Sequence, residues 1–410
     1  MKPAAALERL RATPELARLA AALGEAAPDA FLVGGLLRDA VLERAPGASL
    51  DVDLAVKSGA KALAARAARA LGGTAFLLHE ETRVWRVAVP AGKAGRALQI
   101  DVGEFQGPDI DADLRRRDFT INALAAPLLL GDDARFLDPC GGLPDAAKKI
   151  LRLAGPRALS EDPLRVLRAF RLAATLGLRI EPKTLAAARA ARGLLSSCSG
   201  ERVRVELLGI LSVPAAPGLE LMDKAGVLTA VFPELEPSRR CALAYYGKGG
   251  VLRHSLDCVA RMDRLLAGLE EIYPRHAERL RAHLAGGLGG AERHAALLRL
   301  AVLLHDVSKP ECAKRIGGRL RFFGHDAKGA ERVEAILRRL RFSGDEIAMS
   351  RAAVLHHLRP GNLAAGGRLS DKAIFRFFRD LGPHGVDLLL LCWADHASYL
   401  KPAALERLLP

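Results

Sequence analysis

The chain has 410 residues, a formal net charge of +14 and a sequence pI near 9.8. The excess of positive charge indicates an anionic partner, which fits RNA, and the low aromatic content of 5% argues against a protein that stacks bases on aromatic platforms. No apolar run is long enough for a membrane span, and charges begin too early for a secretory leader, so we expect a cytoplasmic protein with no membrane partner.

The length favours two or three domains. We expect a sheet-bearing head over residues 1–135, a helical neck and body over 136–245, and a further helical domain over 246–410. The fold class is therefore α+β, with a small mixed sheet followed by an all-helical remainder. The six cysteines are scattered and form no Cys-x-x-Cys pair, which is typical of reduced thiols in a cytoplasmic protein.

The first predicted strand, Phe31 to Val33, stops at Gly34 and Gly35 and is followed by residues with helical spacing from Leu36 to Leu42. Two glycines allow a phosphate to approach the backbone closely, and the free N–H groups at a helix start favour an anion. A tight turn with no ligand explains this pattern equally well, since the spacing fits neither the Walker loop nor the dinucleotide fingerprint.

Aliphatic residues alternate with Asp51 and Asp53 between residues 50 and 56, which predicts a strand with one apolar face and both carboxylates on the other. Residues 83–89 and 97–102 predict a hairpin whose second strand places Asp101 opposite its own apolar face. Neighbouring carboxylates repel unless a hard cation such as Mg²⁺ lies between them. Three acids on one sheet face therefore suit two-metal nucleotidyl transfer, and a solvated strand edge is the alternative.

Residues 116–123 combine two arginines, an aspartate and an asparagine with helix formers. Packing alone does not explain this mixture, which indicates a nucleotide site.

A helix is predicted from Glu161 to Leu176, with Ser160 as its N-cap and Pro163 in its first turn. Asp162 and Arg165 then lie one turn apart, where a carboxylate acceptor and a guanidinium donor can together meet the Watson–Crick edge of a base. An ordinary ion pair, worth ~0.2–0.5 kcal/mol, accounts for the same spacing.

Five motifs in this order resemble those of the bacterial class II tRNA nucleotidyltransferases and poly(A) polymerases. They are Gly34–Asp39, Asp51–Asp53, Arg116–Ala123, Asp138–Gly142 and Glu161–Ala169, and the resemblance extends over residues 31–235. It implies a small mixed-sheet nucleotidyltransferase head of the polymerase β type, Mg²⁺ at the transferase site, and tRNA, CTP and ATP as partners.

The resemblance also implies roles for individual residues. Asp51, Asp53 and Asp101 are the expected catalytic carboxylates, and Asp51 and Asp53 are the expected Mg²⁺ ligands. The expected nucleotide-binding residues are Gly34, Gly35, Arg38, Arg116, Arg117, Asp118, Asn122, Asp162, Arg165 and Arg168. Among these, Asp162 and Arg165 are expected to select the incoming CTP or ATP without a nucleic-acid template.

In the last third, histidines and aspartates follow the order of the HD metal-dependent phosphohydrolase superfamily, whose central motif resembles residues 303–309. The expected metal ligands are His254, His305, Asp306 and Asp395, with His325 and His356 available for a second ion. Imidazole and carboxylate suit a transition metal such as Mn, Ni, Fe or Zn. Five histidines lie outside the pattern and are interpreted as ordinary surface or core residues: His276, His283, His294, His384 and His396.

Together the resemblances imply a template-independent enzyme that adds the 3′-terminal CCA of tRNA from CTP and ATP, releases pyrophosphate and carries an HD phosphohydrolase site. Only residues 106–112 separate Phe105 from Asp113, where many CCA-adding relatives have a longer flexible loop, so a CC-adding enzyme is an alternative. Poly(A) polymerase is another, although such enzymes usually have a long basic C-terminal tail and no HD metal site. An HD phosphohydrolase or a non-catalytic RNA-binding protein is the alternative of another class.

Overall fold

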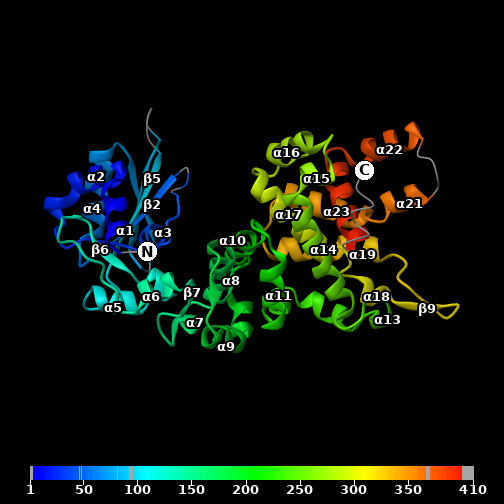
Figure 1. Ribbon diagram of the computed structural model, residues 1–410, viewed down its shortest axis with the longest axis horizontal. Coiled ribbons are helices and arrows are strands. Elements are labelled where there is room, and N and C mark those ends of the chain that lie inside the picture. The colour runs from blue at the N-terminus through cyan, green and yellow to red at the C-terminus, as the bar shows by residue number, and fades with distance from the viewer. Residues whose placement is uncertain are drawn as a thin grey trace. The chain divides into compact units, whose positions relative to one another are not determined.

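The computed structural model describes residues 3–45, 47, 49–80, 82–91, 96–365 and 370–398. They form two compact units, which are coloured along the chain in Figure 1. Unit 1 comprises Met1–Arg165 with Leu178–Leu185, and unit 2 comprises Val166–Gly177 with Ala186–Pro410. Unit 1 contains a mixed sheet with helices and unit 2 is mostly helical, so the expected α+β fold class is confirmed. All six cysteines are free thiols.

The sheet of unit 1 has six strands in the order β3-β4-β5-β2-β1-β6. They are β1 (Phe31–Val33), β2 (Ser49–Val56), β3 (Thr74–His79), β4 (Val84–Val89), β5 (Ala97–Glu104) and β6 (Ala125–Pro127). β2 and β5 are parallel, and the other neighbours are antiparallel. The strand predicted at residues 50–56 and the hairpin formed by β4 and β5 are confirmed, and the turn of that hairpin at residues 92–95 lies outside the described residues.

Short helices surround this sheet. They are α1 (Pro3–Arg11), α2 (Pro14–Leu23), η1 (Gly24–Ala26), α3 (Gly35–Val41), α4 (Ala60–Leu71), α5 (Ile110–Arg115), η2 (Thr120–Asn122), α6 (Gly142–Ala147) and α7 (Ala158–Glu161). A separate pair of short parallel strands, β7 (Ile150–Leu151) and β8 (Arg179–Ile180), completes unit 1. The predicted strand, glycine turn and helix are present as β1, Gly34 and α3.

The two faces of β2 differ as its alternation predicts. Val52 and Leu54 are buried, whereas Asp51 is exposed and Asp53 is half-buried. Helix α4 packs against β3, β4 and β5 and contributes Leu63 to the core. The sheet therefore has its aliphatic side chains on one face and its acidic side chains on the other.

The prediction of one continuous helix from Glu161 to Leu176 is wrong at its start. Helix α7 ends at Glu161, Asp162 is extended with φ −142° and ψ 98°, and α8 begins at Arg165. Pro163 explains the break, because its ring disfavours the helical conformation in the preceding residue. Ser160 lies inside α7 and does not cap the longer helix.

Unit 2 is built mainly from helices. From α8 onward they are α8 (Arg165–Leu176), α9 (Pro182–Ala191), η3 (Arg192–Ser197), α10 (Gly200–Leu211), α11 (Ala216–Lys224), α12 (Val227–Val231), η4 (Pro233–Arg240), α13 (Leu243–Tyr246), α14 (Gly250–Ala267), α15 (Leu269–Ile272), α16 (Ala277–Gly286), α17 (Ala291–Leu304), α18 (Lys309–Cys312), α19 (His325–Arg339), α20 (Gly344–His356), α21 (Arg359–Ala365), α22 (Asp371–Leu381) and α23 (His384–Ser398). No helix in the described part of the chain is both long enough and apolar enough to cross a membrane.

Helix α17 is the centre of unit 2. Every residue from Ala296 to Leu304 is buried, and the helix packs against α10, α14, α16, α20 and α23. A helix that is buried on all sides is stable only when other elements surround it, and its buried Arg299 accordingly donates to Asp263 Oδ1 at 2.6 Å. Its two ends therefore place His294 and His305 inside the unit rather than on its surface.

The prediction of an all-helical remainder is wrong at residues 314–321. Strands β9 (Lys314–Ile316) and β10 (Arg319–Arg321) form an antiparallel hairpin there. Gly317 and Gly318 connect them, both with positive φ, as the two central positions of a type I′ turn require.

Candidate nucleotide and metal sites

The register of the sheet aligns the acidic side chains of unit 1. Asp53 of β2 is directly opposite Asp101 of β5, and Asp101 is opposite Arg86 of β4. Opposed residues in paired strands point to the same face. The Arg86 guanidinium donates to both carboxylate oxygens of Asp101, each at 2.7 Å. The three predicted carboxylates are thus brought together, and Arg86 is a partner that the sequence interpretation did not single out.

Asp53 is held against the glycine turn. A Cβ added to Gly34 would lie 2.7 Å from Asp53 Oδ2, and the φ of +73° at Gly34 is itself favourable only for glycine. Burial raises the pKa of Asp53, Arg117 and a hydrogen bond from the Gly35 backbone oppose this effect, and the charges of Asp101 and Asp51 add to it. Crowded oxygen ligands with mutual repulsion fit a hard divalent cation, so this donor set is suited to Mg²⁺.

A hydrogen-bonded network connects three of the predicted nucleotide-binding residues. Arg38 Nη1 donates to Asn122 Oδ1 at 3.0 Å, and Asn122 Nδ2 donates to Asp118 Oδ1 at 2.9 Å. The same Asp118 oxygen accepts the backbone N–H of Phe119 at 2.8 Å. Helix α3 and η2 therefore hold a guanidinium, an amide and a carboxylate in fixed relation, as ligand recognition requires.

Arg117 and Arg116 have different surroundings. Arg117 Nη2 and Nε donate to Asp113 Oδ2 at 3.0 and 3.2 Å, while the other oxygen of Asp113 accepts the backbone N–H of Gln106 at 2.9 Å. Arg116 is exposed, and its Nη1 donates to the carbonyl of Gln106 at 3.2 Å. The short connection after β5 is thus tied at Gln106 to two residues, and Asp113 is a structural acid that the sequence interpretation missed.

The break between α7 and α8 places Asp162 and Arg165 differently from the expected helix face. Asp162 Oδ1 accepts the backbone N–H of Leu164 at 3.2 Å. Arg165 Nη1 donates to the carbonyls of Arg116 and Ala158, at 3.3 and 3.1 Å. The main chain of residue 116 therefore links Arg165 to residues 116–123, the predicted nucleotide-binding motif.

Arg168 belongs to unit 2 and has its own partner there. Its Nε donates to Glu206 Oε1 at 3.1 Å, and Arg171 pairs with the other Glu206 oxygen. Glu206 is only 3% exposed, so the two arginines compensate a buried charge. The contact orients the Arg168 guanidinium, and the nucleotide-binding role of Arg168 stays a prediction.

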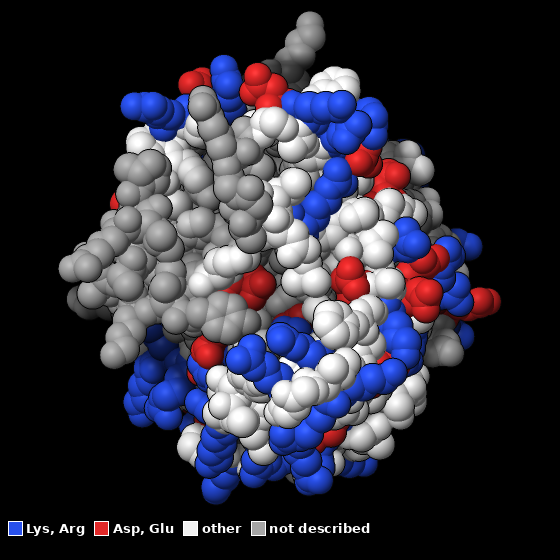
Figure 2. Space-filling view, turned by 90° about the vertical axis from the view of Figure 1, so that its right-hand side faces the viewer, with Lys and Arg blue, Asp and Glu red and all other residues white. Residues whose placement is uncertain are grey.

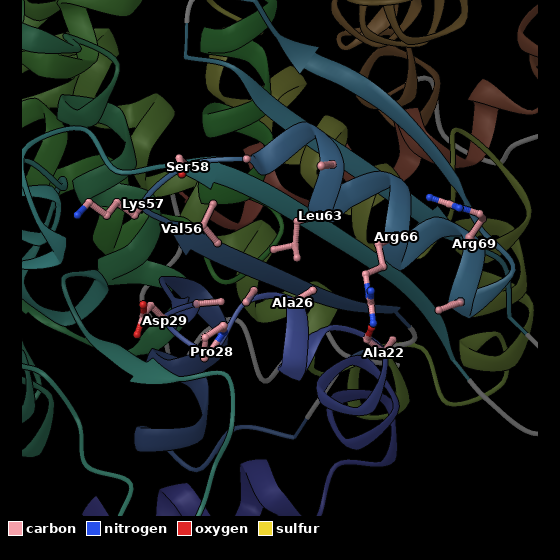
Figure 3. Close-up of a pocket in the computed structure, with 15 residues that line it drawn as sticks. Ala22, Ala26, Pro28, Asp29, Val56, Lys57, Ser58, Leu63, Arg66 and Arg69 are labelled. Atoms are coloured by element: carbon pink, nitrogen blue, oxygen red, sulfur yellow. The ribbon is translucent and has the colours of Figure 1, made fainter.

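A separate pocket lies on the other side of β2. Figure 3 shows it between the segment from Ala22 to Asp29, the turn after Val56, and helix α4. Arg66 of α4 donates to the Ala22 carbonyl at 2.9 Å. Val56 is an odd number of positions from Asp53, so the two side chains point to opposite faces of β2. None of the predicted site residues lines this pocket.

In unit 2, imidazoles and carboxylates from three segments converge: α14, the end of α17, and α23. His254 Nε2 lies 3.4 Å from Asp306 Oδ2 and 3.2 Å from Asp395 Oδ1. His305 Nε2 lies 3.2 Å from Asp306 Oδ2 and 3.8 Å from Asp395 Oδ1. Cys258 also approaches His254, with Sγ at 3.6 Å from Nδ1, and was not expected from the sequence. All four predicted ligands are thus brought together.

The opposite oxygen of Asp306 faces a second pair of imidazoles. His325 Nε2 and His357 Nε2 lie 3.4 and 3.7 Å from Asp306 Oδ1, and 3.1 Å from each other. The sequence interpretation chose His356, and the structure corrects this choice to His357. Adjacent residues in a helical turn point about 100° apart, so only one of the pair can face the cluster.

The ring orientations suit metal ligation. His305, His325 and His357 each place Nδ1 at 2.7 Å from the carbonyl oxygen three residues earlier, which leaves Nε2 directed at the cluster. This backbone contact is the usual support of a metal-binding imidazole. His305 Nε2 and Asp306 Oδ1 are buried and accept no hydrogen bond, and burial lowers the pKa of His357 to about 4, which keeps its ring neutral. The donor set fits two transition-metal ions that share Asp306.

Two family models match the chain. One, described as the poly A polymerase head domain, matches residues 30–152. The other, described as a probable RNA and SrmB- binding site of polymerase A, matches residues 177–238.

The chain is 36% identical over 390 residues to the A-adding tRNA nucleotidyltransferase of Deinococcus radiodurans, covering 92% of this chain and 79% of that protein. It is 34% identical over 384 residues to the CC-adding tRNA nucleotidyltransferase of Thermus thermophilus, covering 90% and 76%. The structure of the Thermotoga maritima CCA-adding enzyme with tRNA superposes with a TM-score of 0.65 and 22% identity, covering 94% and 80%, which supports the fold.

The neighbouring histidines 356 and 357 provide a matched test of the cluster in unit 2. His357→Ala should weaken Mn²⁺ or Zn²⁺ binding by more than the roughly 10–100-fold that second-shell changes cost, because it removes a ligand. His356→Ala should leave the affinity unchanged. Isothermal titration of both variants checks this, and equal losses in the two would contradict the placement of His357.

Proposed function

The chain belongs to the tRNA nucleotidyltransferase and poly(A) polymerase family, and from this membership we propose that it adds cytidine and adenosine nucleotides from CTP and ATP to the 3′ end of tRNA. The proposal rests mainly on the acidic row of unit 1, which consists of Asp51, Asp53 and Asp101. Asp53 and Asp101 share one sheet face, beside a glycine turn and the network of Arg38 and Asn122.

In the proposed reaction, the terminal hydroxyl oxygen of the RNA bonds to the α-phosphorus of the nucleotide, its proton is released and pyrophosphate leaves. Divalent cations held by Asp51, Asp53 and Asp101 would activate that hydroxyl and neutralise charge on the phosphates. We propose that Arg117 contacts the triphosphate, which is supported by its closeness to Asp53, where its charge opposes the rise in pKa that burial causes. We also propose that Asp118 and Asn122 orient the ribose, because their side chains can accept from and donate to its hydroxyl groups.

We propose that base selection involves Asp162 and Arg165. The extended conformation of Asp162 takes it out of helix geometry, and Arg165 contacts the carbonyl of Arg116. Because of this hydrogen bond, a shift of Arg165 toward a base would also move the main chain of the proposed phosphate-binding motif. A carboxylate acceptor and a forked donor can match the distinct hydrogen-bonding edges of cytosine and adenine.

The proposal also concerns which nucleotides are added. We propose addition of the complete CCA sequence, and a specific observation favours CC addition as the second candidate. The connection from Gln106 to Ala112 is short and is held by Asp113 and Arg116, where the resemblance associates a long flexible loop with the change from C to A. The similarity to an A-adding protein makes A addition alone a third outcome to be tested.

Three tRNA transcripts distinguish these outcomes, ending before the first C, before the second C, and before the A. Full CCA addition predicts CTP incorporation on the first two and ATP incorporation on the third. A CC-adding enzyme would leave the third unextended, and an A-adding enzyme would extend only the third. A long adenosine tract on any transcript would identify a poly(A) polymerase instead, and no extension of any transcript would contradict the transferase proposal.

The acidic row predicts the effect of a charge-neutral replacement. Asp53→Asn keeps the shape but removes a metal-ligating charge, so addition of C and of A should both fall by at least ~10³-fold while tRNA binding is retained. Asp132→Asn is the matched control, since Asp132 is a fully exposed acid of the same unit. Single-turnover incorporation and filter binding provide the two measurements, and near-normal incorporation by Asp53→Asn would exclude the proposed role.

A second activity is proposed for the cluster around Asp306, because its two oxygens face different sets of imidazoles. Two ions sharing one carboxylate are suited to hydrolysis of a phosphate ester, with one bound water as nucleophile. An RNA end is a suitable substrate class, because the hairpin that precedes His325 exposes Lys314, Arg315, Arg319 and Arg321. Lysine and arginine side chains also gather in the lower half of the face shown in Figure 2.

Replacement of two ligands should separate the activities. In His305→Gln combined with Asp306→Asn, metal-dependent hydrolysis of 2′,3′-cyclic AMP should be lost, while nucleotide addition stays near normal because the two sites use different ligands. Hydrolysis is followed with Mn²⁺, Ni²⁺, Zn²⁺ and Mg²⁺, and circular dichroism checks folding. Absence of hydrolysis in the wild type with all four ions, or equal rates in the double variant, would reject the second activity.

A further inference from the structure

A second cluster of histidines lies at the opposite end of α17. His283 of α16 and His294 of α17 place their Nε2 atoms 2.7 and 2.8 Å from the same oxygen of Asp387, at the start of α23. His384 Nδ1 lies 3.6 Å from the other oxygen of Asp387. These residues share no member with the cluster around Asp306. His283, His294 and Asp387, from three helices, therefore converge on one point, and His384 lies beside the other oxygen of Asp387.

Burying this cluster without a bound cation costs free energy, because a charged carboxylate is removed from water. Asp387 and His294 are 1% and 2% exposed, and the ion-pair partners of Asp387 within the described residues are all imidazoles. A buried carboxylate needs a compensating positive charge, and neutral histidines supply none.

We infer that His283, His294 and Asp387, with His384 or a water as fourth ligand, form a binding site for a divalent transition-metal ion, most suitably Zn²⁺. Two imidazoles and a carboxylate are a common zinc donor set. Ligand bonds of about 2.0–2.1 Å in a tetrahedron separate the ligand atoms by about 3.3 Å, so the present 2.7 and 2.8 Å contacts need to open by only about half an ångström.

The surroundings provide access and a fourth position. A pocket borders the cluster, and His283, His294, His384, Asp387 and Asp345 all line it. Asp345 is exposed and would attract a cation to the opening. His384 and Asp387 are three positions apart on α23, a spacing that puts both side chains on one helix face.

The position indicates what the ion would do. Helix α17 carries His294 near its start and ends at His305, while α23 carries Asp387 near its start and Asp395 further along. At 1.5 Å per residue, the two clusters lie roughly 12–16 Å apart along these helices. An ion at His294 and Asp387 would therefore fix α16, α17 and α23 to one another and hold the helices that carry His305 and Asp395 in register.

Metal counting on the full chain tests the site. After removal of ions with a chelator and reloading with Zn²⁺, His283→Gln and Asp387→Asn should each retain about one ion per chain fewer than wild type, and Co²⁺ loading should lose the corresponding tetrahedral absorption bands. His276→Gln is the matched control, since His276 is an exposed histidine just before α16. His283 is partly exposed, so its variant remains informative even if Asp387→Asn fails to fold.

Thermal melting gives a second readout. Zn²⁺ added to chelator-treated protein should raise the melting temperature of unit 2 in the wild type and in His276→Gln by about 5 °C more than in His283→Gln. Nucleotide addition should be unchanged in all three. Equal ion counts and equal melting shifts in wild type and both cluster variants would overturn the inference and leave a purely hydrogen-bonded contact between the three helices.

Discussion

The parallel pairing of β2 with β5 places the Asp53 and Asp101 carboxylates directly opposite each other, and the proposed transferase site depends on that register. A slip of one residue would turn one of them into the core. The resulting charge crowding is partly relieved by Arg86 and Arg117, and the glycine turn approaches so closely that a side chain at Gly34 would meet Asp53. The strand register thus creates repulsion between the carboxylates, and the neighbouring guanidinium groups reduce it.

Buried carboxylate charge also needs compensation in unit 2, where helices rather than a sheet hold the acidic side chains. Asp306 and Asp387 are buried carboxylates that imidazoles surround, Asp306 also accepting from the Lys309 ammonium, and both clusters lie towards the ends of the helix pair α17 and α23. Helix α17 is buried because it is mostly apolar and its interior Arg299 pairs with Asp263, and this places its terminal histidines where water cannot solvate their partners. This one core helix therefore has a cluster at each end in which a metal ion would compensate the carboxylate charge that water cannot reach.

The residues proposed for base selection and for phosphate binding are connected through the main chain at residue 116. Arg165 donates to the carbonyl of Arg116, whose side chain contacts the carbonyl of Gln106. Asp113 binds both the backbone N–H of Gln106 and the guanidinium of Arg117. In the proposed function, a change of base would therefore reach this short, hydrogen-bonded connection, which is the physical reason to test whether one site can serve both C and A.

The sequence by itself determined the sheet face of the acids, since alternation from Leu50 to Val56 has a period that only a strand satisfies. It also predicted the fold class and the candidate metal ligands His254, His305, Asp306 and Asp395, which the fold brings together. Tertiary structure alone decided which of His356 and His357 faces Asp306, because helical rotation depends on packing. It also brought His283, His294 and Asp387 together, since residues nearly a hundred positions apart meet only when three helices pack. The break before Arg165 was readable from Pro163, but the contact of Arg165 with Arg116 required the folded chain.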